Sequence, residues 1–280
     1  MNTPYQAPTQ PWQGAPGPAY ASPIPVRNAT LGDALRSEWT KIRTVRSTLW
    51  TLGIMLVLVI GIGLLVASAA SGHSLNGAPI LFFGFFGVLL GSLCVITLGV
   101  LVITAEYGTG MIRTTLTACP SRSRVLAAKA IVFFALALVL TTAACFLVAA
   151  IDSSMLSGSG APTPSGGAWV RATLGAGLYV ALLGLLSLAV GSLLRHSAGA
   201  ITTMLGVVLL PLILALFMQT QSLETVREKL MDYSVPNSLA VIYGSEGGNG
   251  PHGWTPLWIL AAVTTAALAA AFTTVNKRDV

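Results

Sequence analysis

LWTLGIMLVLVIGIGLLVASAA, residues 49–70, runs without a single charged side chain. A helix needs about 20 apolar residues to cross a hydrocarbon layer about 30 Å thick, so this stretch is long enough to span a membrane. Five similar stretches follow, at about residues 80–104, 125–150, 170–194, 197–218 and 255–275. We therefore predict an all-α polytopic membrane protein with six transmembrane helices.

The composition agrees with this prediction. The chain of 280 residues is 54% hydrophobic and only 9% charged, whereas a soluble domain carries about 25% charged residues. So few charges cannot cover a water-facing surface, and an ordinary soluble fold is excluded. The net charge of +6 is interpreted as a topology signal rather than a nucleic-acid footprint, because the cations lie mainly at the ends of the apolar stretches.

The distribution of Lys and Arg predicts the orientation. Cytoplasmic segments carry the excess of cations in membrane proteins. If the N-terminus is inside, all but three of the 15 cations are cytoplasmic, the exceptions being Arg171, Arg227 and Lys229. We expect a multi-pass plasma-membrane protein with both termini in the cytoplasm. Only Arg195 and His196 separate the fourth and fifth stretches, which predicts a tight antiparallel hairpin.

Residues 1–29 contain seven prolines and predict a disordered cytoplasmic tail; residues 30–280 form the predicted six-span domain. Residues 30–47 have apolar side chains at three- and four-residue spacing, which favours an amphipathic interfacial helix. Thr30 and Asp33 resemble a capping box at its start. Glu38 and Arg46 fall within the apolar arc and blur the pattern. The predicted membrane-contacting residues are Trp39 towards lipid and Lys41, Arg43 and Arg46 towards head groups.

The segment between the second and third spans is the most structured polar one. Glu106 ends a span, and Gly108 and Gly110 permit a sharp change of direction. Residues 111–116 can form a short helix before Pro120 stops it. Two interpretations stay open at this point: a surface helix rimmed by cations, or a basic connector that only enforces topology.

The last outer segment, about residues 219–254, also contains predicted structure. Residues 222–233 (SLETVREKLMDY) have a helix-starting serine and charges at helical spacing. After Pro236, residues 237–243 (NSLAVIY) are too short to span and predict a re-entrant or interfacial helix. Gly87 and Gly91, four residues apart, indicate close helix packing, either within the subunit or across a dimer interface.

Several kinds of chemistry have no matching motif. The chain has no G-x-x-x-x-G-K-[ST] loop, so it cannot bind and hydrolyse ATP by that route. No span carries a charge near its middle, as proton- or sodium-coupled carriers usually do. The three histidines are scattered without metal-ligand spacing, and no nucleophilic triad is evident. We therefore predict no catalytic, cofactor or metal site in this chain, and an apolar or amphipathic transport path.

Three segments together resemble the membrane subunits of type-2 ATP-binding-cassette exporters, most closely the actinobacterial permeases. They are residues 37–52 (SEWTKIRTVRSTLWTL), residues 106–130 (EYGTGMIRTTLTACPSRSRVLAAKA) and the Pro-Asn helix before the last span. The resemblance covers about residues 30–280. It implies a permease subunit, with no ATPase motif of its own, that joins a second permease and separate P-loop ATPases, which bind ATP and Mg. Whether the two permeases are identical stays open.

The resemblance also implies roles for particular segments. Residues 30–47 would be a connecting helix, and residues 108–118 a coupling helix that docks on the ATPase. Glu106 would anchor the coupling element and Arg113 would lie near the ATPase contact, although Gly108 stands where the family often has a longer polar side chain. The predicted coupling residues are Glu106, Tyr107, Gly108, Thr109, Met111, Ile112, Arg113 and Thr114. The predicted outer-gate residues are Pro236, Asn237 and Ser238.

Two other function classes stay open. The chain could be an autonomous channel or secondary carrier, or a membrane scaffold that transports nothing. Co-purification with a P-loop ATPase distinguishes the exporter subunit from both.

Overall fold

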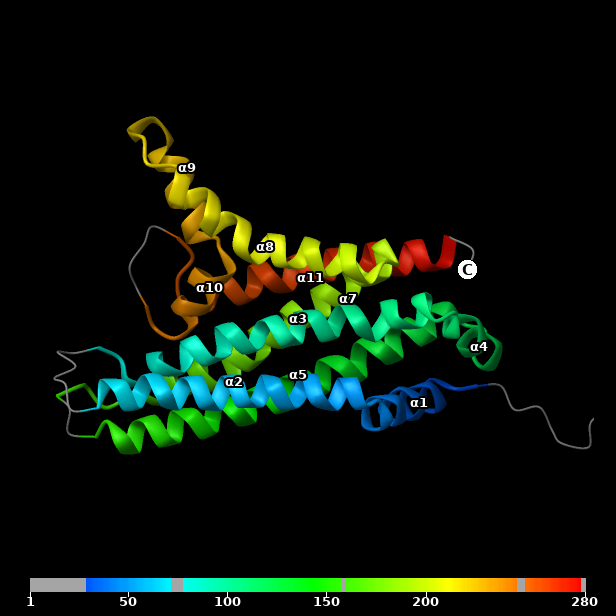
Figure 1. Ribbon diagram of the computed structural model, residues 1–280, viewed down its shortest axis with the longest axis horizontal. Coiled ribbons are helices and arrows are strands. Elements are labelled where there is room, and N and C mark those ends of the chain that lie inside the picture. The colour runs from blue at the N-terminus through cyan, green and yellow to red at the C-terminus, as the bar shows by residue number, and fades with distance from the viewer. Residues whose placement is uncertain (1–28, 72–77, 158–159, 246–249, 278–280) are drawn as a thin grey trace, which may run out of the picture.

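The computed structural model describes residues 29–71, 78–157, 160–245 and 250–277, and within these ranges it contains helices and no strand (Figure 1). Six helical rods are long and apolar enough to cross a membrane, which confirms the prediction of six candidate spans. They are α2 (Arg46–Ala70), η1 with α3 (Ile80–Phe83, Gly84–Gly108), α5 (Arg122–Met155), α6 with η2 and α7 (Gly166–Val170, Arg171–Gly175, Ala176–Leu194), α8 (Ser197–Phe217) and α11 (Thr255–Lys277).

The short helices lie at the two ends of this bundle. The helix α1 (Leu31–Thr44) and the helix α4 (Met111–Ala118) lie at the same end as the C-terminal end of α11, which we name the α4 end (Figure 1). The helices α9 (Glu224–Asp232) and α10 (Val235–Ile242) lie at the opposite end, where α9 projects away from the bundle. The first described residues and the last therefore lie at the same end.

The helix α7 forms the centre of the bundle. It contacts α3, α5, α8 and α11, and its span is the most buried of the six. Small residues permit this packing: a Cβ atom on Gly99 of α3 would lie 2.4 Å from the carbonyl oxygen of Gly184 on α7. A side chain at Gly99 would therefore force α3 and α7 apart.

Gly87 and Gly91 pack within the subunit. A Cβ atom on Gly87 would lie 2.3 Å from the carbonyl oxygen of Val59 on α2, and one on Gly91 would lie 2.6 Å from Val59 Cγ2. Of the two interpretations that the sequence left open for this pair, the structure supports close packing of α3 against α2.

The predicted helix over residues 30–47 is two helices. The capping box is present, because the Thr30 hydroxyl accepts from the Asp33 N–H and the Asp33 carboxylate accepts from the Thr30 N–H. Val45 then adopts an extended backbone with φ −79° and ψ 111°, which ends α1. Arg46 is therefore the first residue of α2. This explains why Arg46 did not fit the apolar pattern of the interfacial helix.

The segment before the last span folds as two helices near the predicted positions. Ser234 caps α10 by accepting from the Asn237 N–H, and Pro236 lies in the first helical turn rather than before it, where a missing N–H costs nothing. The last five residues of α10 are buried, so it packs into the bundle against α3, α7, α8 and α11. The predicted disordered tail, residues 1–29, lies outside the described residues except for Ala29.

Candidate functional site

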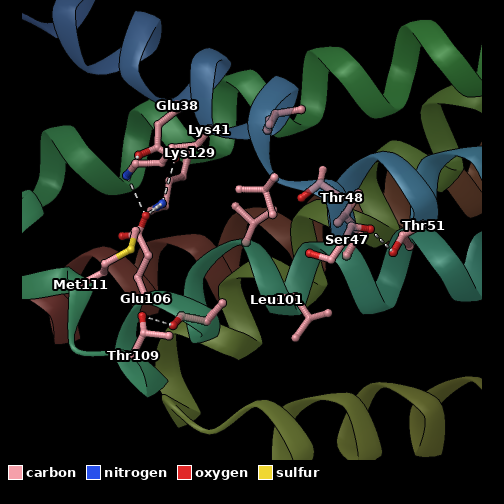
Figure 2. A pocket seen from close by; sticks show the side chains of 15 residues that line it. Glu38, Lys41, Ser47, Thr48, Thr51, Leu101, Glu106, Thr109, Met111 and Lys129 are labelled. Atoms are coloured by element: carbon pink, nitrogen blue, oxygen red, sulfur yellow. Dashed lines mark hydrogen bonds and ion pairs between the residues drawn. The ribbon is translucent and has the colours of Figure 1, made fainter.

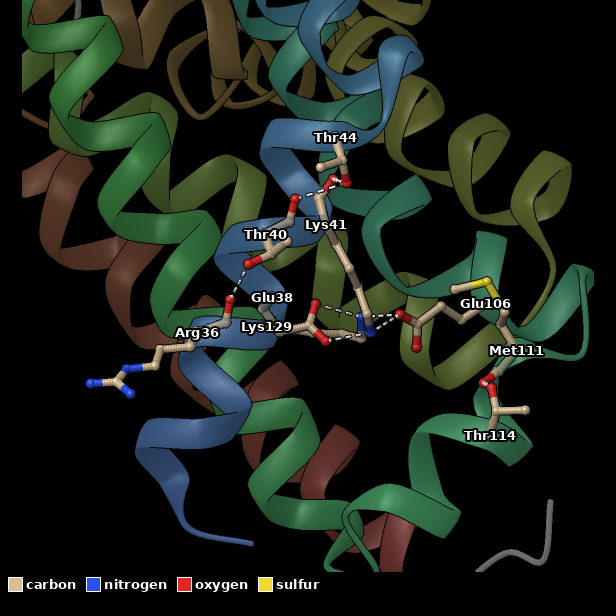
Figure 3. Close-up of polar contacts among 9 residues, drawn as sticks. All are labelled: Arg36, Glu38, Thr40, Lys41, Thr44, Glu106, Met111, Thr114 and Lys129. Atoms are coloured by element: carbon tan, nitrogen blue, oxygen red, sulfur yellow. Dashed lines mark hydrogen bonds and ion pairs between the residues drawn. The ribbon is translucent and has the colours of Figure 1, made fainter.

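Four charged side chains meet at the α4 end of the bundle (Figure 3). Glu38 and Lys41 come from α1, Glu106 from the end of α3 and Lys129 from α5. Lys129 Nζ donates to Glu38 Oε2 at 2.8 Å and to Glu106 Oε1 at 2.6 Å. Lys41 Nζ donates to Glu38 Oε1 at 2.8 Å and to Glu106 Oε1 at 2.7 Å. We name this closed set of four contacts the ionic ring.

Three of the four members of the ionic ring are almost fully removed from solvent. Lys129 is 2% exposed, and Glu38 and Glu106 are each 5% exposed. Charges buried in this way carry a large desolvation cost that only close opposite charges offset. Two lysines and two glutamates give the ring no net charge, and each ammonium contacts both carboxylates. The four contacts therefore balance the charges of the ring, with Glu106 Oε2 left buried without a hydrogen-bond partner, and they hold three helices in one relative position.

Lys41 is the most accessible member of the ring. Burial lowers the pKa of this ammonium, but its hydrogen bonds to Glu106 and Glu38, together with their negative charges, outweigh burial and raise the pKa above its ordinary value of 10.5. Lys41 is therefore charged at neutral pH and completes the ring.

Glu106 is the member that joins the ring to α4. Its Oε1 accepts from both lysines, and two residues later α3 ends at Gly108. Gly110 then adopts a left-handed backbone with φ 72°, a conformation that glycine reaches without a steric penalty. This residue turns the chain into α4, so the orientation of α4 depends on a segment that the ring fixes.

The helix α4 presents most of its surface to the outside. Ile112 is its buried residue, and α4 contacts the bundle through α3 and α5. Met111, Arg113 and Thr114 are exposed. Two hydroxyls satisfy local carbonyls, Thr109 donating to Ala105 and Thr114 donating to Met111. Thr115 and Leu116 are half-buried, so α4 is attached mainly by Ile112. An eight-residue helix that keeps most of its remaining surface exposed is suited to contact another protein.

A groove extends from the ionic ring between α1, α2 and α3 (Figure 2). Its volume is about 290 Å³, at the lower end of the range of about 300–1,000 Å³ found for ligand pockets. The ring residues line one end, apolar residues such as Leu101 and Val102 line the walls, and Ser47, Thr48 and Thr51 add hydroxyls. The groove is thus amphipathic, with its charges gathered at the α4 end.

The structure brings together only part of the predicted site. Glu106 and Lys41 meet in the ring, and the Tyr107 ring lies 5.0 Å beneath the guanidinium of Arg195. Trp39, Arg43 and Arg46 are exposed and lie outside the ring. The predicted outer-gate residues lie at the opposite end, where the Asn237 side chain donates to the Asp232 carbonyl and Ser238 is buried. These two groups of residues are therefore separate.

The sequence prediction missed the roles of Glu38 and Lys129. Glu38 lies on the apolar arc of α1, where an unpaired carboxylate would be costly. Lys129 lies inside the third apolar stretch, and the prediction of orientation uses it only as one of the cytoplasmic cations. Glu38 and Lys129 carry opposite charges, and each lies where apolar residues are expected. This combination was the signal that could have predicted their contact.

Six membrane-length helices define a polytopic helical membrane protein, and the ionic ring lies at one end of its bundle. A family model described as ABC-2 family transporter protein matches residues 34–209. This is more than half of the chain, and the protein therefore belongs to the ABC-2 transporter family. A comparison with curated proteins gave no match.

Proposed function

We propose that this chain is the permease subunit of an ATP-driven exporter. A separate P-loop ATPase subunit binds ATP and Mg and hydrolyses ATP, and this chain couples that hydrolysis to export of a hydrophobic or amphipathic substrate. A second permease subunit completes the transport unit in the plasma membrane, with both termini of each permease in the cytoplasm. The similarity to actinobacterial permeases is part of this proposal.

The ionic ring is the observation that carries the proposal. It ties α1 and α5 to the end of α3, and α4 follows α3 after a two-residue turn. A displacement of α4 would act on α3 through the backbone. It would act on α1 and α5 through Glu106, because breaking a buried ion pair costs about 3–5 kcal/mol. Residues 108–118 thus have the connections that a coupling element requires.

Two features of the sequence support a motor on another chain. The sequence contains no P-loop, and the family consists of transport subunits rather than ATPases. The spans also lack a charge near their middle, which argues against transport driven by protons or sodium ions.

The test is co-purification of the chain with an ATPase from its native membrane in mild detergent. We expect the unaltered chain to recover a P-loop ATPase, and the complex in nanodiscs to hydrolyse ATP. Arg113→Ala removes a charged contact worth about 1.5–3 kcal/mol, which lowers recovery of the ATPase about 10-fold or more. Glu106→Ala lowers ATP hydrolysis while the chain still inserts into the membrane.

The matched control is Lys229→Ala, which removes an exposed cation at the opposite end of the molecule. It should leave recovery and hydrolysis unchanged. If no ATPase accompanies the unaltered chain, the proposal is wrong. Solute flux through the purified chain in liposomes without ATP would instead establish an autonomous channel or carrier, and absence of both activities would favour a scaffold.

A further inference from the structure

A cationic feature lies beside α4, separate from the neutral ionic ring. Tyr107, Gly110, Ile112, Arg113 and Arg195 line an open hollow of about 410 Å³. These residues come from the end of α3, from α4 and its preceding turn, and from the turn between α7 and α8. Two guanidinium groups from distant parts of the sequence therefore border one hollow.

The turn between α7 and α8 holds Arg195 in a defined position. Arg195 is the non-glycine residue with positive φ in the described part of the chain, at 53°. This left-handed backbone is unfavourable for a residue with a side chain, and it persists only where the surrounding structure enforces it. His196 caps α8 by accepting from the Gly199 N–H at 3.0 Å. The guanidinium also stacks over Tyr107 at 5.0 Å, which orients Arg195 towards the hollow.

The exposed charge of the α4 end is positive in the part of the chain that the structure describes. Among the described residues near the α4 end, Glu38 and Glu106 are buried in the ionic ring, and Asp33 is bonded within the capping box. Within the described ranges, the exposed charged side chains of this end are cations, namely Arg36, Arg43, Arg46, Arg113 and Lys277. A surface of this kind is complementary to acidic groups on a partner.

We propose that this hollow, which we name the two-arginine hollow, receives an Asp or Glu side chain of the ATPase subunit. This inference rests on the proposed function. It adds the chemistry of one contact with the ATPase, and it adds the turn between α7 and α8 as a second contacting segment. Guanidinium groups bind carboxylates through two parallel N–H···O bonds, and Arg113 and Arg195 supply two such groups. A concave site formed by α4 and a neighbouring turn is suited to one inserted side chain, whereas a lipid surface requires no hollow.

Zero-length cross-linking tests this contact directly. Carbodiimide joins a lysine amine to a carboxylate in contact with it, with loss of water, and it does not join arginine. In the complex carrying Arg195→Lys, we expect an amide bond between position 195 and an Asp or Glu of the ATPase, identified by mass spectrometry. Arg36→Lys is the matched control, since Arg36 is an exposed cation of the same end that does not line the hollow. It should give no such link.

Charge reversal provides the second measurement. Arg195→Glu should lower recovery of the ATPase at least 10-fold, while Arg36→Glu, with the same change in net charge, should lower it less than 2-fold. Equal effects of the two substitutions would overturn the inference in favour of general electrostatic attraction.

The remaining outcomes separate the two proposals. If the unaltered chain recovers the ATPase and Arg195→Glu does so equally well, the two-arginine hollow is not a contact, although the proposed function stands. An effect of Arg195→Glu seen in nanodiscs with phosphatidylglycerol, but not in those of phosphatidylcholine alone, would assign the hollow to a lipid phosphate and overturn the inference. Failure of the unaltered chain to recover any ATPase refutes the proposed function itself.

Discussion

At the scale of single residues, Lys129 is the most consequential side chain of the molecule. It is 2% exposed and contacts both carboxylates of the ionic ring, so it neutralises charge that Lys41 alone cannot. A buried ion pair adds little stability relative to a well-packed apolar replacement, but removal of one partner leaves an uncompensated charge. Replacing one charged member of the ring should therefore destabilise the fold more than replacing two oppositely charged members together.

We predict that Lys129→Met destabilises the folded protein. The substitution leaves Glu38 and Glu106 buried with Lys41 alone, and we expect it to lower the free energy of unfolding by about 3–5 kcal/mol. Denaturant titration of the detergent-solubilised protein, followed by tryptophan fluorescence, measures this loss. Lys277→Met, which removes an exposed cation, serves as the control and should change stability by less than about 0.5 kcal/mol.

A double substitution distinguishes ion pairing from general damage to packing. Glu38→Gln in the Lys129→Met background removes the charge left without its partner, so the doubly substituted protein should be more stable than the sum of the two single effects predicts. Simple additivity of the two effects would contradict direct coupling of Glu38 and Lys129.

At the scale of elements, the contact of α2 with α3 depends on the absence of side chains. Gly87 and Gly91 lie against Val59 at distances that no Cβ atom could keep. Because lipid tails are as apolar as the helices, close packing rather than hydrophobic burial holds such a pair together. Small residues at the crossing therefore have the function that large apolar residues have in a soluble core.

Gly87→Ala should consequently weaken the bundle, although alanine is the better helix former. The added methyl group would lie 2.3 Å from the Val59 carbonyl oxygen, and overpacking of this kind costs about 1–3 kcal/mol. Thermal unfolding in detergent measures the effect. Gly61→Ala on the facing helix α2 is the matched control, because a Cβ atom there has nothing within 4 Å. Equal melting temperatures for the two variants would show that the crossing tolerates separation.

The six spans could be predicted from the sequence because length and apolar composition determine them with little help from tertiary contacts. The boundary between α1 and α2 could not, since Val45 is an ordinary apolar residue whose extended backbone depends on how the two helices pack. The contacts of the ionic ring could not be predicted from the sequence for a related reason. Its members are separated by up to 91 positions in the sequence, and only the fold shows which opposite charges are neighbours.

At the scale of the whole molecule, burial is uneven across the six spans. In the span that contains α7, 67% of the most apolar 18-residue stretch is buried inside the protein. The corresponding share is 22% for α8 and 22% for α11. The exposed apolar side chains of α8 include Leu210, Leu216 and Phe217. Lipid or, in the proposed complex, a second permease subunit would cover such faces in the membrane, while the opposite faces of α8 and α11 contact the central α7.

The orientation of the whole molecule is a prediction that chemical labelling tests. We expect a cysteine introduced at Gln221, which is exposed near α9, to react with a membrane-impermeant maleimide added to intact cells. A cysteine introduced at Lys277, exposed at the α4 end, should react only after the cells are permeabilised. Both variants should have Cys94, Cys119 and Cys145 replaced by serine. The opposite pattern of labelling would reverse the predicted topology.

The ionic ring also has a consequence for the order of assembly during translation. The ribosome makes Glu38, Lys41 and Glu106 before Lys129, so the two acids and the first lysine enter the membrane region before the fourth member exists. Lys129 lies near the start of α5, and its charge reaches the bilayer ahead of the apolar residues that follow. The waiting carboxylates would neutralise that charge on arrival. Closure of the ring would thus fix α1 in place only when the third span inserts, after the first two spans are already in the membrane.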